Sequence, residues 1–150
     1  MKMKTQKIYR AKSQITHKCQ VEITAREHIV LADEPKPMGD NEGMTPMELL
    51  LGALGSCKSL VFKAAAKQHN VIYSQLEIEV EGDFDSAGYM GDPTVAIGFS
   101  AIRTIYHLVS DAPESELEDL IAYVESHCPV AATIDVAPTK TAVLRRNTGL

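Results

Sequence analysis

The sequence predicts an α+β fold, in which helices pack against antiparallel sheet. Three observations favour this class: short runs in which apolar and polar residues alternate, one long apolar helix in the middle of the chain, and a second, amphipathic helix further on. Along the chain the order is strands, helix, strands, helix, strand. The chain has 150 residues, enough to bury a sizeable core, and we expect a single domain over residues 1–150.

The first 34 residues have β character. The runs Lys7–Ala11, His17–Thr24 and His28–Ala32 carry alternating or β-branched residues, with breaks near Ser13 and Ala25–Glu27. Two or three antiparallel strands are the natural interpretation. A polar loop rich in proline and glycine follows, and loops of this kind often frame a site.

The central stretch Met44–Asn70 is predicted to be one helix with a well-marked start. Thr45 suits the N-cap and Pro46 the first helical position, and Glu48 completes a capping box with Thr45. Apolar residues cover nearly every face, which predicts a buried helix. At 1.5 Å per residue the helix would be about 36 Å long. A chain of this size is not expected to bury that length alone, so we expect a second subunit to cover part of it.

Two glycines, Gly52 and Gly55, lie inside this helix shortly before Cys57. Each interior glycine destabilises a helix by about 1 kcal/mol. Close packing of another element beside Cys57 is the simplest compensation, and we expect it there.

The second half of the chain predicts a hairpin. In Ser74–Phe84, apolar residues alternate with glutamates, as in a strand with one face on the core and one exposed to solvent. Asp85–Pro93 is predicted to be a turn. Thr94–Val109 is long for one strand, and a bulge or bend is expected near Ser100–Arg103.

The C-terminal part predicts a helix over Glu114–Ser126, whose apolar residues recur at helical spacing opposite an acidic face. Pro129 then suits the start of a short helical turn over Val130–Thr133. Lys140–Leu144 is predicted to be a last strand.

Composition excludes several classes of function. The net charge of −5 provides no basic surface for nucleic acid. No stretch of 18 uninterrupted apolar residues predicts a membrane span, and no apolar run follows the basic start as in a signal peptide. We therefore expect a cytoplasmic protein. Three cysteines in such a chain are not expected to form a disulfide scaffold. Their role is then in catalysis, in redox chemistry, or they have no chemical role.

Cys57 and Cys128 are the residues of chemical interest. Cys57 lies among apolar and small residues, where a free cysteine is more often an inert core residue than a reactive one. Cys128 directly precedes Pro129, which places it at a helix N-cap, where free backbone N–H groups favour a thiolate. Cys19 lies in a predicted strand without special neighbours and is interpreted as structural.

Other assignments compete for these residues. The cysteines are too scattered for a zinc site, and His127 beside Cys128 cannot easily share a metal with it, so we expect neither a metal nor a bound cofactor. A cysteine–histidine nucleophile stays open, since spatial pairing cannot be read from sequence. Glu48 is nine residues before Cys57, about 13 Å along a helix axis, so the two cannot touch within one helix. Its ordinary role is in the capping box.

Taken together, these segments resemble the OsmC/Ohr family, the osmotically inducible protein C and organic hydroperoxide resistance proteins, and more closely the OsmC-like branch. The resemblance rests on Thr45-Pro46-Met47-Glu48-Leu49-Leu50-Leu51 leading to Gly55-Ser56-Cys57, on Val80-Glu81-Gly82, and on His127-Cys128-Pro129-Val130-Ala131. It covers about residues 20–145. The two cysteine motifs are fairly specific together and weak separately.

The resemblance implies an intertwined homodimer, with antiparallel sheets packed around central buried helices. It also implies a thiol peroxidase in which Cys57 is the peroxidatic cysteine and Cys128 the resolving one. A dithiol reductant, often a lipoyl group in this family, would restore both thiols. An apolar surrounding of Cys57 would favour organic hydroperoxides as substrates.

The sequence departs from the peroxidase members at the two residues that assist the thiolate. Aligned on Thr45-Pro46 and Cys57, Met47 takes the usual place of the glutamate, one residue before Glu48. The family arginine has no clear match: Arg10, Arg26 and Arg103 could each stabilise a thiolate, and Arg26 is the nearest upstream candidate. These departures keep a second function open: a protein of this fold that binds a small hydrophobic or redox ligand without efficient peroxidase activity. An acyl-transfer enzyme with Cys57 as nucleophile is a third, and it requires a histidine beside the sulfur.

Overall fold

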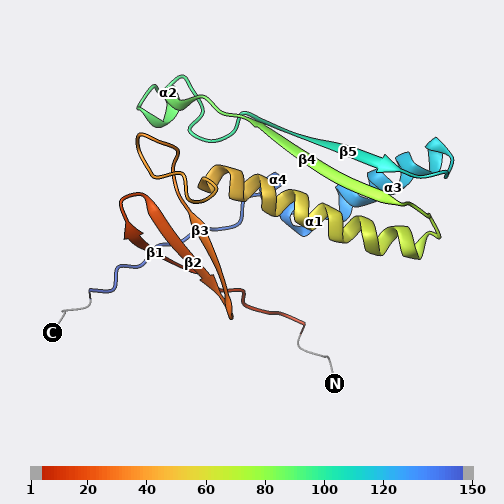
Figure 1. Ribbon diagram of the computed structural model, residues 1–150, viewed down its shortest axis with the longest axis horizontal. Helices are drawn as coiled ribbons and strands as arrows, with labels where there is room; N and C mark the ends of the chain where they lie inside the picture. Colours follow the sequence, from red (N-terminus) through yellow and green to blue (C-terminus); the bar gives the residue numbers. More distant parts are fainter. Residues whose placement is uncertain (1–4, 147–150) are drawn as a thin grey trace. The chain divides into compact units, whose positions relative to one another are not determined.

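The computed structural model describes residues 5–146, which fall into two compact units that meet between Gly52 and Ala53 (Figure 1). The first unit contains three strands and the start of a long helix, α1; the second contains the rest of α1, a two-stranded hairpin and three further helices. Both sheets are antiparallel, which confirms the predicted α+β class. The prediction of one domain stays a prediction.

In the first unit, β2 (Gln20–Ala25) pairs with both β1 (Lys12–His17) and β3 (His28–Ala32). The last two strands agree with the sequence prediction, but a first strand over Lys7–Ala11 is wrong. The strand instead runs through Ser13, where a break was expected. The physical reason is the tight turn just before β2, in which Lys18 has a φ of 46°: it makes the residues immediately upstream the partners of β2.

The loop after β3 is organised around Asp33, whose side chain is only 1% exposed. Its carboxylate accepts hydrogen bonds from the backbone N–H groups of Glu34, Asp40 and Glu42 at 2.8–3.2 Å. Burial acts to raise the pKa of Asp33, but the N–H donors outweigh it and the pKa is lowered. Asp33 is therefore ionised, and its carboxylate holds together the loop that leads into α1.

Helix α1 (Pro46–Gln68) begins as the sequence predicts. The N–H of Glu48 donates to Thr45 Oγ1 at 3.2 Å, and the N–H of Thr45 donates to Glu48 Oε2 at 2.8 Å. Both halves of the capping box are therefore formed, and the Glu48 carboxylate is engaged in it.

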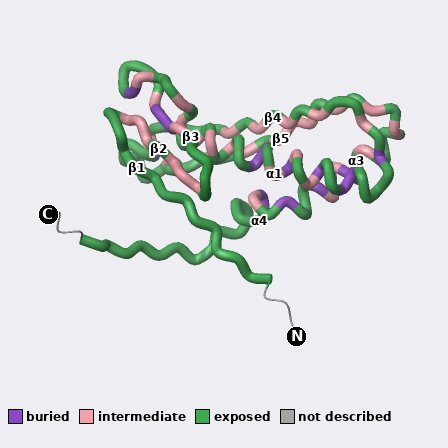
Figure 2. The backbone as a smooth tube through the Cα atoms, turned by 60° about the horizontal axis from the view of Figure 1, so that its bottom comes forward, coloured by how far each residue is buried: buried purple, intermediate pink, exposed green. Residues whose placement is uncertain are grey.

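The core of the second unit lies where one face of α1 meets the hairpin and helix α3 (Glu114–His127). Figure 2 shows buried positions on these two helices and on helix α4 (Pro129–Asp135); Val71, after α1, is buried as well. Phe62 is fully buried and meets the Tyr73 ring edge-on, with the ring centroids 5.2 Å apart. The buried residues of the cluster are Phe62, Ala65, Ala66, Val71, Leu120 and Val124.

Within one chain, α1 is buried on one side only. Leu60, for example, is 69% exposed, because the hairpin and α3 cover only one face of the helix. By length and composition α1 could cross a membrane, but the core helices of soluble proteins have the same properties. A second subunit over the exposed face stays a prediction.

The hairpin consists of β4 (Gln75–Asp83) and β5 (Ala101–Val109), and in Figure 1 it runs along α1. Every residue from Gln75 to Asp83 has a partner in β5 without a shift of register, so the bulge expected near Ser100–Arg103 is wrong. The residues before β5 instead belong to a connection that contains the short helix α2 (Ser86–Tyr89). The Phe99 ring lies so close to Gly82 that any side chain there would clash with it.

Helix α3 ends at His127, and α4 starts again at Pro129, which confirms the predicted helix and the helical turn after it. The predicted last strand over Lys140–Leu144 is wrong: residues 137–146 form neither helix nor strand. Val143 and Leu144 are more than 80% exposed. A β-prone run becomes a strand only where a sheet edge is there to pair with it.

Replacing Phe62 with alanine is expected to lower the free energy of unfolding by about 3–5 kcal/mol, the range for large-to-small changes in a core. Urea denaturation followed by circular dichroism measures this. Ile72→Ala is the matched control, because Ile72 is 84% exposed, and its effect should stay within about 0.5 kcal/mol. Equal effects of the two substitutions would contradict the position of the core.

Candidate functional site

Cys57 and Cys128 lie together in a small apolar cluster of the second unit. Cys57 comes from α1, and Cys128 from the junction of α3 and α4. Cys128 is 1% exposed, whereas Cys57 is only partly buried. The cluster consists of Leu54, Cys128 and Ala131, with Cys57, Val80, Ile102 and Val130 packed against them. The structure therefore brings together the two cysteines singled out in the sequence.

The local sequence explains how Cys128 reaches this place. With φ −75° and ψ 114°, it has an extended backbone, so it ends α3 and acts as the N-cap of α4. Pro129 follows at the first helical position, where its missing N–H costs nothing. The backbone N–H of Ala131 donates to Cys128 Sγ at 3.4 Å. This confirms the N-cap predicted from the Cys-Pro sequence.

Close packing beside Cys57 is found at one of the two glycines of α1. A Cβ atom on Gly55 would lie 3.3 Å from a methyl carbon of Val80, so the helix can approach β4 at this point. A Cβ on Gly52 would meet nothing within 4 Å. The glycine at position 55 thus lets the apolar wall of the hairpin reach the cysteine cluster.

The surroundings of Cys57 raise the pKa of its thiol. Burial is the main cause, and the neighbouring Cys128 thiol acts in the same direction, whereas the backbone N–H of Val130 acts to lower the pKa. Cys57 packs against the cluster that contains Cys128, and both cysteines are free thiols. The reduced Cys57 thiol is therefore mainly protonated at neutral pH.

The other two predicted site residues belong to the first unit. Glu48 is exposed, and its carboxylate is held by the capping box. Arg26 is in the turn between β2 and β3, with a φ of 54°, and its guanidinium lies 3.7 Å from the Glu27 carboxylate. A role of either residue toward Cys57 stays a prediction. Cys19 donates a hydrogen bond from its thiol to the Met38 carbonyl at 3.3 Å, within the same unit.

Within the unit that begins at Ala53, the three histidines have other partners. His69 packs edge-on against Tyr123, His107 is paired with Glu79 at 3.1 Å, and the His127 ring stacks on Tyr123 with a centroid distance of 3.8 Å. None is among the groups that pack on Cys57 or shift its pKa in this unit. The histidine base required for acyl transfer is not found there. Across residues 5–146, His, Cys, Asp and Glu side chains form no cluster suited to a metal ion.

Lys58 is a further residue of this region that the sequence motifs do not single out; it directly follows Cys57 and is 4% exposed. Its ammonium group lies 2.8 Å from both carboxylate oxygens of Glu125 and 2.7 Å from Thr104 Oγ1. The Tyr106 hydroxyl donates to Glu125 Oε1 at 2.6 Å, and burial together with this carboxylate raises the pKa of Tyr106. A signal was present in the sequence: a lysine within an otherwise apolar stretch of helix.

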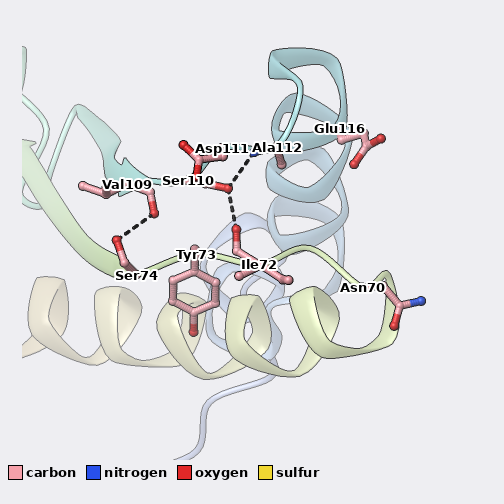
Figure 3. Close-up of a pocket in the computed structure, with 9 residues that line it drawn as sticks. All are labelled: Asn70, Ile72, Tyr73, Ser74, Val109, Ser110, Asp111, Ala112 and Glu116. Atoms are coloured by element: carbon pink, nitrogen blue, oxygen red, sulfur yellow. Dashed lines mark hydrogen bonds between the residues drawn. The ribbon is translucent and has the colours of Figure 1, made fainter.

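A cavity of about 450 Å³ lies at the end of the hairpin, lined by the connection from α1 to β4, the connection from β5 to α3 and the start of α3 (Figure 3). The Ser110 hydroxyl there donates to the Ile72 carbonyl and accepts from the Ala112 N–H. None of the residues around this cavity belongs to the cysteine cluster. These hydrogen bonds close the connecting loops and define no reactive group.

The chain is thus an α+β protein with two neighbouring thiols, one on a central helix and one at a helix N-cap. Comparison with known proteins specifies the class. The OsmC-like protein family matches residues 39–143 of this chain. The chain therefore belongs to the OsmC-like family, as its motifs indicated.

Solved structures agree on the fold. An OsmC-like protein from Mycoplasma pneumoniae superposes with a TM-score of 0.78 at 19% identity, over 87% of this chain and 89% of the other. An organic hydroperoxide resistance protein OsmC from Legionella pneumophila gives a TM-score of 0.66 at 18% identity, over 87% and 91%. An organic hydroperoxide resistance protein from Elizabethkingia anophelis superposes with a TM-score of 0.60 at 18% identity, over 87% of this chain and 91% of the other. No curated protein sequence gives a significant match.

The raised pKa of Cys57 leads to a prediction. The rate of its alkylation by iodoacetamide should rise with pH around a midpoint above the ordinary thiol value of about 8.5, because the reactive thiolate forms late. In Cys128→Ala the midpoint should move to lower pH, since the Cys128 thiol contributes to the upward shift. Peptide mass spectrometry at a series of pH values measures both. A midpoint below the ordinary value would contradict the account of this environment.

Proposed function

We propose that this protein is a thiol peroxidase that reduces organic hydroperoxides by a two-cysteine mechanism. The observation that carries the proposal is the packing of Cys57 against Cys128 in one apolar cluster. Membership of the OsmC-like family supports it, as do solved structures of the same fold that are named organic hydroperoxide resistance proteins.

The proposed reaction balances with the two thiols, one peroxide and one dithiol. The Cys57 thiolate attacks the outer oxygen of the hydroperoxide, the O–O bond breaks, and the alkoxide leaves as an alcohol after taking a proton. Cys57 is then a sulfenic acid. The Cys128 thiol attacks this sulfur, releasing water and forming a disulfide, and a dithiol, such as a lipoyl group, reduces the disulfide by exchange.

The surroundings of Cys57 favour an organic substrate. Leu54, Val80 and Ile102 line the cluster, and apolar side chains of this kind solvate an alkyl group but offer nothing to hydrogen peroxide. The same burial raises the pKa of Cys57, so the rate of peroxide reduction should increase with pH while the enzyme stays folded.

Glu48 and Arg26 are the proposed assisting residues, taken from the family resemblance. Because Glu48 and Cys57 lie in one helix, Glu48 would have to act on the thiolate of another subunit, and it would first have to release the N–H of Thr45 from the capping box. We further propose a cytoplasmic homodimer. The exposed apolar face of α1, for example at Leu60, is what a second subunit would cover.

One observation favours a second function. A thiol with a raised pKa is a poor nucleophile at neutral pH. A chain of this kind would instead bind a small hydrophobic or redox ligand beside the cysteines, without efficient turnover of peroxides. Steady-state peroxide consumption at several pH values separates the two functions, because binding alone consumes nothing.

Two substitutions test the assignment of the cysteines. Cys57→Ser should abolish the consumption of cumene hydroperoxide, since the attacking sulfur is lost. Cys128→Ser should allow one turnover and then fail to recycle with a dithiol, leaving a Cys57 sulfenic acid that oxidises further. Stopped-flow peroxide assays and intact mass measurement record these results.

Cys19→Ser is the matched control, since Cys19 lies outside the cluster and should leave the rate unchanged. Equal turnover by the parent and all three variants would contradict the two-cysteine mechanism.

A further inference from the structure

We propose that the ion pair between Lys58 and Glu125 is a brace that sets the separation of the two cysteines and so stabilises the Cys57–Cys128 disulfide. In this proposal, which rests on the proposed function for its biological meaning, Lys58 and Glu125 are positioning residues. They touch neither substrate nor sulfur.

The position of the pair along the chain is the first argument. Lys58 is the residue after Cys57 in α1, and Glu125 is three residues before Cys128, close to the end of α3. The contact therefore ties the two helices together within one helical turn of each sulfur-bearing residue. A change in the distance between the helices at this contact must change the distance between the cysteines.

The geometry of the lysine is the second argument. An ammonium group has three N–H donors, and all three have an acceptor here: the two oxygens of Glu125 and Thr104 Oγ1, at 2.7–2.8 Å. The Lys58 side chain is 5% exposed, whereas that of Glu125 is 43% exposed. A buried ammonium with every donor occupied has one arrangement, unlike an ion pair on the surface, which samples many.

The surroundings of the pair are the third argument. It lies at a cavity of about 330 Å³, of which Leu54 and Ala131 also form part of the wall. Both of these residues belong to the cysteine cluster. From the hairpin side, the Tyr106 hydroxyl donates a hydrogen bond to Glu125. The ion pair and the thiols thus share packing neighbours.

This arrangement has a consequence for the disulfide. A disulfide forms only when the two Cα atoms come within about 7 Å in a suitable orientation. Holding the thiols near that geometry raises their effective concentration, so the disulfide gains stability against a reference thiol. Its formation releases two protons and two electrons, which oxidised glutathione accepts in the experiment below.

The test is a titration with glutathione redox buffers in the Cys19→Ser background, with the Cys57–Cys128 disulfide quantified by alkylation and mass spectrometry. Lys58→Met/Glu125→Leu replaces the pair with apolar side chains of similar size, which avoids leaving a single buried charge. We expect the equilibrium constant for the disulfide to fall about tenfold, which corresponds to about 30 mV in a two-electron couple. Glu125→Gln, which keeps the shape and removes the charge, should change it in the same direction.

The matched control is Arg103→Gln/Asp83→Asn, which removes an ion pair of the same hairpin whose two side chains are about half exposed. It should leave the equilibrium constant unchanged. The proposal is overturned if a variant without the Lys58–Glu125 pair, shown to be folded by its circular dichroism and melting curve, has the equilibrium constant of the parent. It is also overturned if the parent forms no Cys57–Cys128 disulfide in any buffer.

The titration uses no peroxide, so the proposed function can fail separately. If the parent consumes no hydroperoxide but the variants have a less stable disulfide, the peroxidase activity is contradicted. The proposal that the Lys58–Glu125 pair stabilises the disulfide then still holds.

Discussion

The burial of one face of α1 against the hairpin and α3 is the interaction on which the second unit depends. Leu54, Lys58, Phe62 and Ala65 recur at the spacing of a single helical stripe and are all buried. Phe62 and Ala65 belong to the main core, whereas Leu54 belongs to the cysteine cluster. The packing that stabilises the fold therefore also fixes the height and rotation of Cys57, which lies at the edge of this stripe.

The second cysteine depends on a different constraint, the break between α3 and α4. Extended backbone at Cys128 and the proline after it end one helix and start another at the same residue. The thiol is thereby held at the N-cap rather than on the side of a helix, and it points into the cluster formed with Leu54 and Ala131. Two unrelated local sequence features, the apolar stripe of α1 and the Cys-Pro junction, thus place the two cysteines in one cluster.

Local signals made much of this predictable. The capping box at Thr45, the N-cap at Cys128 and the amphipathic pattern of α3 each specify a helix end or face within a few residues, and each is found in the structure. That Cys57 and Cys128 act together was implied by the family resemblance, since no local sequence pattern relates residues so far apart in the chain. The failures concern non-local partners. The position of β1 depends on its pairing with β2, and the β-prone run at Lys140–Leu144 finds no sheet edge among the described residues.

Lys58 was missed for a related reason. A lysine in an apolar helix can equally reach solvent or find a buried partner, and only the tertiary structure reveals Glu125 and Thr104 around it. Burial of α1 on its remaining faces stays a prediction, because it depends on a second subunit.

The central claim is that Cys57 and Cys128 form one redox pair. It is tested most directly by thiol titration and peptide mapping after one equivalent of cumene hydroperoxide is added to the reduced protein. The account predicts the rapid loss of two thiols, a linked Cys57–Cys128 peptide and an unmodified Cys19. Three surviving thiols would contradict it.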